Sequence, residues 1–132
     1  MIHRITSRLQ FQAVMAGHIV AKTPHFALHR APLVGQHAGH ELFPHMGAWL
    51  GVVLPKRWAR RAVTRNALRR QIYEVSRQLP APLPAHAWVV RLRSEFSRQQ
   101  FISATSPALK AAARAELQQL FAQLPTQGGA HA

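Results

Sequence analysis

Short extended apolar runs alternate in this chain with longer stretches in which apolar residues recur at helical spacing. The first helical stretch has its apolar stripe at Phe11, Val14 and Met15. Ser7 is a suitable N-terminal cap for it, and Gln10, three residues later, completes a capping box. Gly17 suits the C-terminal cap. We therefore predict a helix that begins after Ser7 and ends near Gly17.

Four segments predict strands. Residues 19–21 and 26–28 are short apolar runs separated by a proline. Residues 49–54 are apolar without interruption, which is typical of a buried central strand. Residues 87–93 alternate, with Trp88 on one face and Arg91 on the other, which predicts a half-buried strand.

Two longer helices are predicted, over residues 61–79 and 106–124. In the first, Leu68, Ile72, Val75 and Leu79 form an apolar stripe beside a face that carries arginines. The second begins with a serine and a proline in the favoured order for an N-terminus. Its predicted core face consists of Leu109, Ala113, Leu117, Leu120 and Leu124.

The resulting order, α-β-β-β-α-β-α, predicts an α+β fold, an α/β sandwich with three helices packed on an approximately four-stranded mixed sheet. We expect a single domain over residues 1–125 and a disordered tail over residues 126–132. Residues 32–47 contain several glycines and prolines, so we expect a long mobile hairpin loop there.

The charge balance indicates the class of partner. Seventeen Lys and Arg face four acidic residues among 132, for a net charge of +13. Fourteen of the seventeen are Arg, whose planar side chain binds phosphates and stacks on bases. Nucleic acid is the leading expected partner and an anionic membrane surface the second. No apolar segment reaches the roughly 20 residues of a membrane span, and we expect a cytoplasmic protein.

The positive charge is concentrated after the third predicted strand. Seven cations lie within the fifteen residues 56–70, and no acidic residue follows before Glu74. A solvated helix face usually carries both signs, so this one predicts a binding surface.

Candidate catalytic chemistry is sparse. The chain has no Asp and no Cys, and its four Glu lie far apart in sequence, so paired carboxylates for acid–base work or for Mg²⁺ are not apparent. His37, His40 and His45 lie in the expected loop without metal-ligand spacing. His25 and His29 fall on one face of a predicted strand, where structural or RNA-facing roles are favoured. We predict no catalytic residue, no cofactor-binding residue and no metal ligand.

The basic stretch resembles the protein subunit of bacterial ribonuclease P. That family has a Gly-x-x-Val strand, a basic pair and a helix of the form Ala-x-x-Arg-Asn-Arg-x-Lys-Arg. The matching segments here are residues 51–54, 56–57 and 62–70. Weaker similarity extends over about residues 4–124. Ala67 replaces the central Arg of Arg-Asn-Arg, and Arg69 stands where Lys is usual.

The resemblance implies an accessory subunit of an endonuclease that removes the 5′ leader of precursor tRNA. The catalyst would be the RNA subunit, with Mg²⁺ acting mainly through that RNA, and the fold would contain a left-handed β-α-β crossover. The expected contacts to the ribozyme are Lys56, Arg57, Arg61, Arg65, Asn66, Arg69 and Arg70. The expected contacts to the leader, in a cleft between the sheet and the first helix, are Phe11, Met15, Phe26 and His29. Arg91 and Arg93 could flank the same cleft.

Three alternatives remain open from the residues. A ribosomal-type RNA-binding domain would bind RNA without stimulating cleavage. A DNA-binding protein would read duplex DNA with residues 61–77, although a preceding helix and turn are not evident. A self-sufficient His-based ribonuclease would cleave RNA without an RNA subunit. The oligomeric state is not indicated.

Overall fold

The computed structural model describes residues 2–37, 39–96 and 107–125. Within them, five strands form one mixed sheet in the order β1-β6-β7-β3-β2, and two very short strands form a separate hairpin. The helices are α1 (Arg8–Met15), α2 (Ala62–Arg77) and α3 (Pro107–Ala122). The strands are β1 (Ile2–Arg4), β2 (His18–Lys22), β3 (Phe26–Ala31), β4 (Gln36–His37), β5 (His40–Glu41), β6 (Ala48–Val53) and β7 (Ala87–Leu92).

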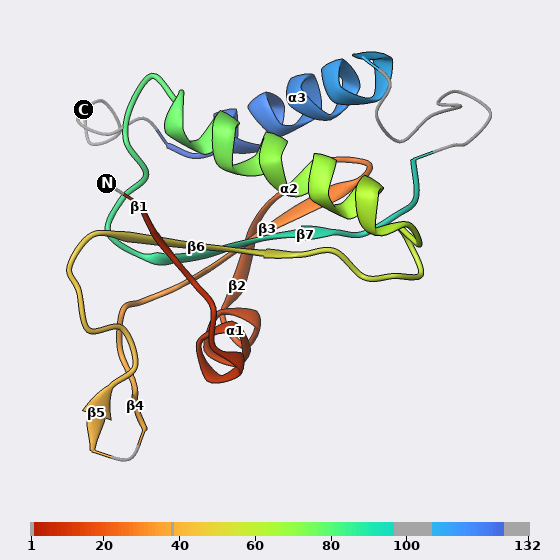
Figure 1. Cartoon of the computed structure of the whole chain (residues 1–132). Coiled ribbons are helices and arrows are strands. Elements are labelled where there is room, and N and C mark those ends of the chain that lie inside the picture. The colour runs from red at the N-terminus through yellow and green to blue at the C-terminus, as the bar shows by residue number, and fades with distance from the viewer. Residues whose placement is uncertain (1, 38, 97–106, 126–132) are drawn as a thin grey trace.

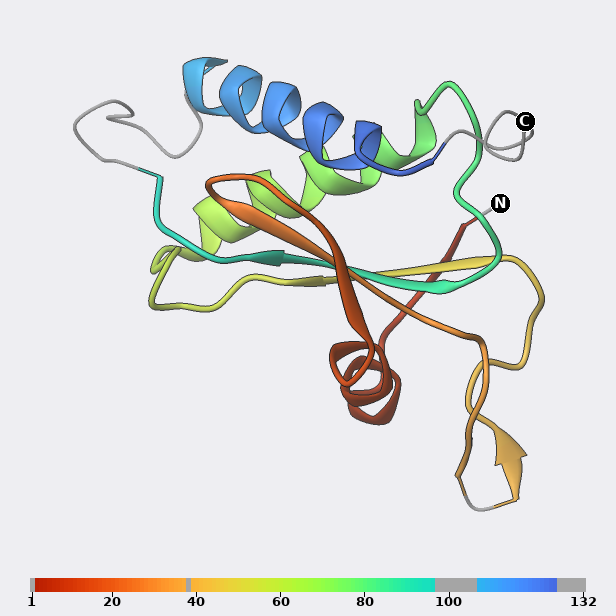
Figure 2. The same cartoon turned by 180° about the vertical axis from the view of Figure 1, so that it is seen from behind.

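The sheet separates two layers of helix. Helices α2 and α3 lie side by side over one face, and α1 crosses the other face alone (Figure 1; Figure 2 shows the same arrangement from behind). The predicted α+β fold is therefore confirmed, with one strand more than expected in the sheet. Strand β1 was not predicted because its three residues are too few for a periodic pattern. It is formed by parallel pairing with β6.

The connection from β6 through α2 to β7 is left-handed. Strands β6 and β7 pair in parallel, and both run from left to right in Figure 1, with α2 above them. Strand β1 is nearest the viewer there and β2 is farthest, so the strand order places β7 behind β6. This hand is the one that the family resemblance implied, and it is the opposite of the usual right-handed crossover.

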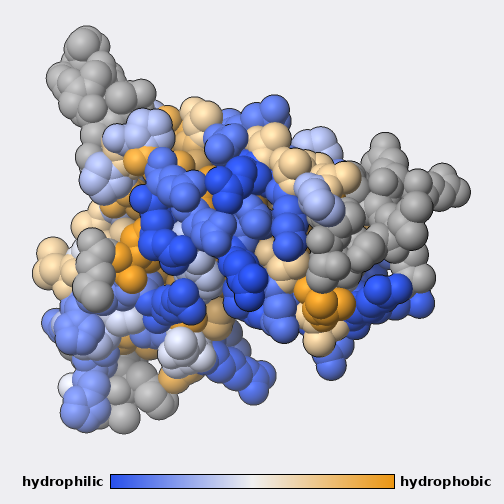
Figure 3. Space-filling view, turned by 45° about the horizontal axis from the view of Figure 1, so that its top comes forward, coloured by the Kyte–Doolittle hydropathy of each residue, from blue (hydrophilic) through white to orange (hydrophobic). Residues whose placement is uncertain are grey.

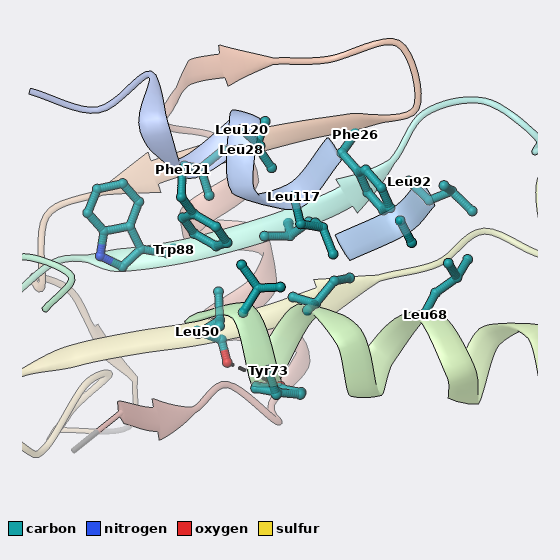
Figure 4. Close-up of a cluster of buried hydrophobic side chains, with 14 of the residues drawn as sticks. Phe26, Leu28, Leu50, Leu68, Tyr73, Trp88, Leu92, Leu117, Leu120 and Phe121 are labelled. Atoms are coloured by element: carbon teal, nitrogen blue, oxygen red, sulfur yellow. Dashed lines mark hydrogen bonds between the residues drawn. The ribbon is translucent and has the colours of Figure 1, made fainter. Parts of the chain in front are cut away.

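The larger core fills the space between the sheet and the two long helices. Leu68 of α2 and Leu117 of α3 belong to this core together with Leu50, Trp88 and Phe26 of the sheet (Figure 4). All five side chains are at most 1% exposed. The stripe predicted on residues 61–79 is correct for Leu68, Ile72 and Val75, which are buried, whereas Leu79 lies beyond the end of α2 and is half-buried.

A second, smaller core lies under α1. Val14 packs there with Ile5, Trp49 and Val89. This core corrects the prediction of a half-buried strand at residues 87–93, because α1 covers the face that was expected to be open. Val89 is 0% exposed, and β7 is the central strand of the sheet.

Helix α1 begins as predicted, and a close approach fixes its end. The Ser7 side chain accepts from the Gln10 amide, and the Gln10 side chain accepts from the Ser7 amide. Gly17 does not adopt a left-handed cap. A glycine is required here because the end of α1 approaches β3 closely. A Cβ on residue 17 would lie 2.3 Å from the Arg30 carbonyl oxygen of β3.

The loop over residues 32–47 carries the β4–β5 hairpin, which extends away from the sheet on the α1 side (Figure 1). Gly39 occupies its turn, and a Cβ there would meet no atom within 4 Å. The loop is anchored where the Gln10 side-chain amide donates to the Leu42 carbonyl over 2.9 Å. The predicted core face of α3 is buried at Leu109, Ala113, Leu117 and Leu120 and half-buried at Leu124. The predicted start at Ser106 and the tail lie outside the described residues.

Candidate nucleic-acid interface

The basic pair lies on a tight turn between β6 and α2. The amides of Trp58 and Ala59 both donate to the Pro55 carbonyl, at 3.0 and 3.1 Å. Ala59 is buried and holds the turn against the core. Lys56 and Arg57, between these points, are therefore exposed to solvent.

Arg65, in the first part of α2, stabilises this turn. Its guanidinium donates to the carbonyls of Ala59 and Arg60, both at 2.9 Å. The side chain is half-buried and folds back toward the turn. Arg65 thus has a structural role that sequence reasoning missed, although its position in the cationic stretch was noted.

The remaining cations of α2 stand on its outer surface. Arg61 and Arg70 are exposed, and so is Asn66. Arg69 donates to the Asn66 side-chain oxygen over 3.0 Å. The helix has no acidic residue in its first turn and no side-chain cap at Arg61, so the positive end of its dipole adds to these charges.

Strand β1 contributes a cation that sequence reasoning did not include in the surface. The Arg4 guanidinium carbon lies 4.1 Å from the centre of the Tyr73 ring, and the Tyr73 hydroxyl donates to the Leu50 carbonyl over 3.3 Å. Burial raises the pKa of Tyr73, while Arg4 and Arg69 oppose that rise. Only strand pairing brings Arg4 to α2, and no local signal indicates it.

The cations around α2, together with Asn66, form one surface that we call the cationic face. Its members are Lys56, Arg57, Arg60, Arg61, Asn66, Arg69, Arg70, Arg4 and Arg77. On the side where α2 comes forward, hydrophilic residues form a broad continuous area (Figure 3). Of the acidic residues, Glu74 is bound to Arg114 of α3 over 2.9 Å. Neutralisation of Glu74 within the protein leaves the surrounding cations to act on an external anion.

The residues predicted to line a cleft beside α1 lie, apart from Phe26, on the opposite face of the sheet. Phe11 is half-buried and lies across β6, because a Cβ on Gly51 would come within 2.5 Å of its ring. Met15, one turn later, is 36% exposed. His29 of β3 and Arg91 of β7 are on this same sheet face, where the Arg91 Nε–H donates to His29 Nε2 over 3.0 Å.

His29 is held in its neutral form. Burial lowers its pKa, and the nearby Arg91 charge lowers it further. Since Nε2 accepts from Arg91, the ring proton is on Nδ1, and this buried atom has no hydrogen-bond partner within the described part of the chain. His29 is 4% exposed, so neither its ring face nor the buried Nδ1 is open to a ligand, and its contact within the described residues is with Arg91.

Phe26 corrects the predicted cleft. It is 0% exposed and belongs to the core under α2 and α3. Side chains alternate along β3, so Phe26 and Leu28 point to one face and His29 to the other. Phe26 therefore cannot contact a ligand beside α1. Arg93 also lies apart from His29, since its guanidinium donates to the Thr23 carbonyl at 2.9 Å.

Metal-binding geometry is not evident in residues 2–37, 39–96 and 107–125, where no three His, Asp or Glu side chains gather. His45 stacks with His3 at a ring distance of 5.3 Å. His25 binds Glu116, with 2.7 Å between Nδ1 and a carboxylate oxygen. None of the helices in those residues has the length and apolar character to cross a membrane.

Comparisons with known proteins agree with this geometry. The family model described as Ribonuclease P matches residues 2–123. A ribonuclease P protein component of Bordetella petrii is 37% identical over 118 residues, covering 87% of this chain and 85% of the relative. One from Bordetella parapertussis is 46% identical over 77 residues, and this match spans 58% of each chain.

Solved structures show the same fold. The RNase P protein of Staphylococcus aureus superposes with a TM-score of 0.64 at 19% identity, covering 91% of this chain and 93% of the other. That of Thermotoga maritima gives 0.62 at 18% identity, covering 94% and 99%.

Proposed function

This chain belongs to the ribonuclease P protein family, and we propose that it is the protein subunit of a ribonucleoprotein that removes the 5′ leader of precursor tRNA. In this proposal the cationic face binds the catalytic RNA, and the cleft beside α1 holds the leader. The RNA subunit is the catalyst and holds the Mg²⁺ ions. The complex acts in the cytoplasm.

The observation that carries this proposal is the separation of two surfaces by one sheet. The cationic face surrounds α2, whereas Phe11, Met15, His29 and Arg91 lie on the α1 side of the sheet. A protein built in this way can hold two segments of RNA together. Its contribution to cleavage is then to position the substrate.

Each surface suits a different kind of contact. Arg and Lys on the cationic face neutralise phosphates and release counterions. Each phosphate contact makes the slope of log affinity against log salt steeper by about 0.7–0.9. In the cleft, the Phe11 ring can pack on an unstacked base, which is worth about 1–3 kcal/mol and tolerates any sequence. His29 holds Arg91 on the same face of the sheet.

Cleavage of precursor tRNA tests the proposal. We would compare the protein, the cognate catalytic RNA, and both together at limiting Mg²⁺. The expected result is slow cleavage by the RNA, faster cleavage by the mixture and none by the protein. A rate unchanged by the protein would favour an RNA-binding domain of ribosomal type. Cleavage by the protein without RNA, lost in His29→Ala, would favour a His-based ribonuclease.

A pair of variants tests the division between the surfaces. Arg61→Gln with Arg70→Gln should weaken binding of the catalytic RNA, since both side chains are exposed and neither substitution disturbs the core. Phe11→Ala should weaken binding of precursor tRNA and leave mature tRNA unaffected. Lys22→Gln, which removes one positive charge away from α2, is the control, because Lys22 is exposed on the edge strand β2. Equal effects of the double and control variants would refute the role of α2.

A further inference from the structure

A hollow of about 750 Å³ lies where the last turn of α2 meets the edge strand β1. Ile2, Ala48 and Leu83 give it an apolar lining, and Arg4 and Arg77 contribute two guanidinium groups. Its size is within the range of small-molecule sites. Among the described residues, none that lines it is acidic.

The polar atoms of this lining are mostly engaged within the protein. The Ser76 hydroxyl donates to the Tyr73 carbonyl over 2.7 Å, and the Tyr73 hydroxyl donates to Leu50. Arg4 lies over the Tyr73 ring, with its guanidinium carbon 4.1 Å from the ring centre, and it is exposed to solvent. The hollow therefore offers an apolar wall, a stacking plane and positive charge, with few neutral hydrogen-bonding groups.

This chemistry suits a nucleotide. A base stacks on aromatic rings and on arginine planes, and its phosphate pairs with guanidinium groups. An acidic peptide would use the charge but would leave the apolar lining in water. A purely apolar ligand would leave two cations without a counter-charge. The base and phosphate of one nucleotide satisfy both parts of the site.

The hollow is also continuous with the cationic face. Arg4 and Arg77 of the cationic face both line the hollow, and Arg77 is on the last turn of α2. An RNA strand that follows α2 from its N-terminus would reach the hollow at the end of the helix.

We propose that this hollow receives one unstacked nucleotide of the RNA that binds α2, with its base against the apolar lining and its phosphate beside Arg4 and Arg77. The proposal rests on the proposed function for the identity of the RNA. It adds a base-binding site to a surface otherwise made of phosphate contacts.

Two matched substitutions in the connector between α2 and β7 test it. Ala85 and Ala81 are both exposed; Ala85 lines this hollow, whereas Ala81 lines a separate hollow between α2 and α3. Ala85→Phe should fill the site and weaken binding of the catalytic RNA on the order of tenfold, the worth of one stacked base. Ala81→Phe should bind as the original protein does. Equal affinities for the two variants would overturn the proposal.

A second measurement needs no catalytic RNA and so remains informative if the proposed function fails. Nucleoside monophosphates would be titrated into the full-length protein and followed by amide NMR. We expect saturable shifts at Gly47, Ala48 and Tyr73 that are lost in Ala85→Phe and retained in Ala81→Phe. Inorganic phosphate and uncharged nucleosides should bind more weakly. Absent shifts, or equal shifts with inorganic phosphate, would overturn the nucleotide site.

Discussion

Neighbouring residues of β3 have opposite environments because side chains alternate across a strand. Phe26 lies in the larger core, while His29, three positions later, faces α1 and accepts a hydrogen bond from Arg91. Resemblance of sequence placed both in one cleft. The sheet places only His29 on the face toward α1, where it is buried and accepts a hydrogen bond from Arg91.

The state of His29 predicts how stability depends on pH. Its pKa is lowered in the folded protein by burial and by Arg91, so the unfolded chain binds a proton more readily near its ordinary pKa of about 6.5. The free energy of unfolding should therefore fall as pH decreases from 7.5 to 5.5. His86, whose pKa is lowered by burial and by Arg30, contributes in the same direction.

Urea unfolding at several pH values checks this prediction. His29→Gln keeps an acceptor for Arg91 but does not titrate, so its stability should fall less over this interval. His18→Gln is the control, because His18 is exposed. A pH dependence that is identical in His29→Gln and the original protein would contradict the prediction.

Gly51→Ala should displace the Phe11 ring from its place on β6. The new methyl group would lie 2.5 Å from the ring and 2.9 Å from the Ile5 Cβ, and overpacking of this kind costs about 1–3 kcal/mol. We expect lower stability by urea unfolding and weaker binding of precursor tRNA. The double variant Gly51→Ala, Phe11→Leu should recover stability without recovering leader binding. Recovery of both would show that the ring is not a leader contact.

Among the secondary-structure elements, α2 packs one side in the core and exposes arginines on the other. Leu68 and Ile72 are buried while Arg61 and Arg70 remain exposed, so the arginines project from a rigid base. The preceding turn is fixed by Arg65. Arg65→Ala should therefore disturb the whole basic turn, whereas substitutions at exposed arginines should remove single contacts.

The salt dependence of RNA binding separates these two roles. For each of Arg61→Gln and Arg70→Gln, the slope of log affinity against log salt should become shallower by about 0.7–0.9, one phosphate contact. Arg65→Ala should reduce the slope by more than one contact, because the turn presents Lys56 and Arg57. Filter binding between low and moderate salt measures the slopes. A loss of a single contact in Arg65→Ala would argue against its structural role.

Helix α3 is tied to the turn between β2 and β3 through one carboxylate. Glu116 accepts from the Thr23 hydroxyl at 2.6 Å and from the His25 amide at 2.7 Å, and it also binds the His25 ring. Glu116→Ala would leave these partly buried donors without an acceptor, at a cost of about 2–3 kcal/mol. Gln119→Ala, on the exposed side of the same helix, should change stability little. Chemical denaturation of both variants gives the comparison.

For the complete protein, the net charge of +13 opposes the compact state through self-repulsion. Any anion that binds the folded form and not the unfolded form will raise the melting temperature. We predict that sulfate or pyrophosphate stabilises the protein more than chloride does at equal ionic strength. The effect should shrink in Arg61→Gln, Arg70→Gln. Identical melting curves in the three salts would contradict this prediction.

Local information was sufficient for much of this protein. The capping box at Ser7, the two-sided character of α2 and the position of each main strand follow from spacings of a few residues, because those interactions join neighbours in sequence. The same information predicted the basic turn and most of its exposed cations.

Contacts between distant segments settled the rest. The pairing of β1 with β6 brings Arg4 to Tyr73, and α1 closes the second face of the central strand. The face on which Phe26 points, and the hollow beside Arg77, depend on how strands register and helices pack. No spacing along the chain encodes these features, since each arises from residues that meet only when the sheet is assembled.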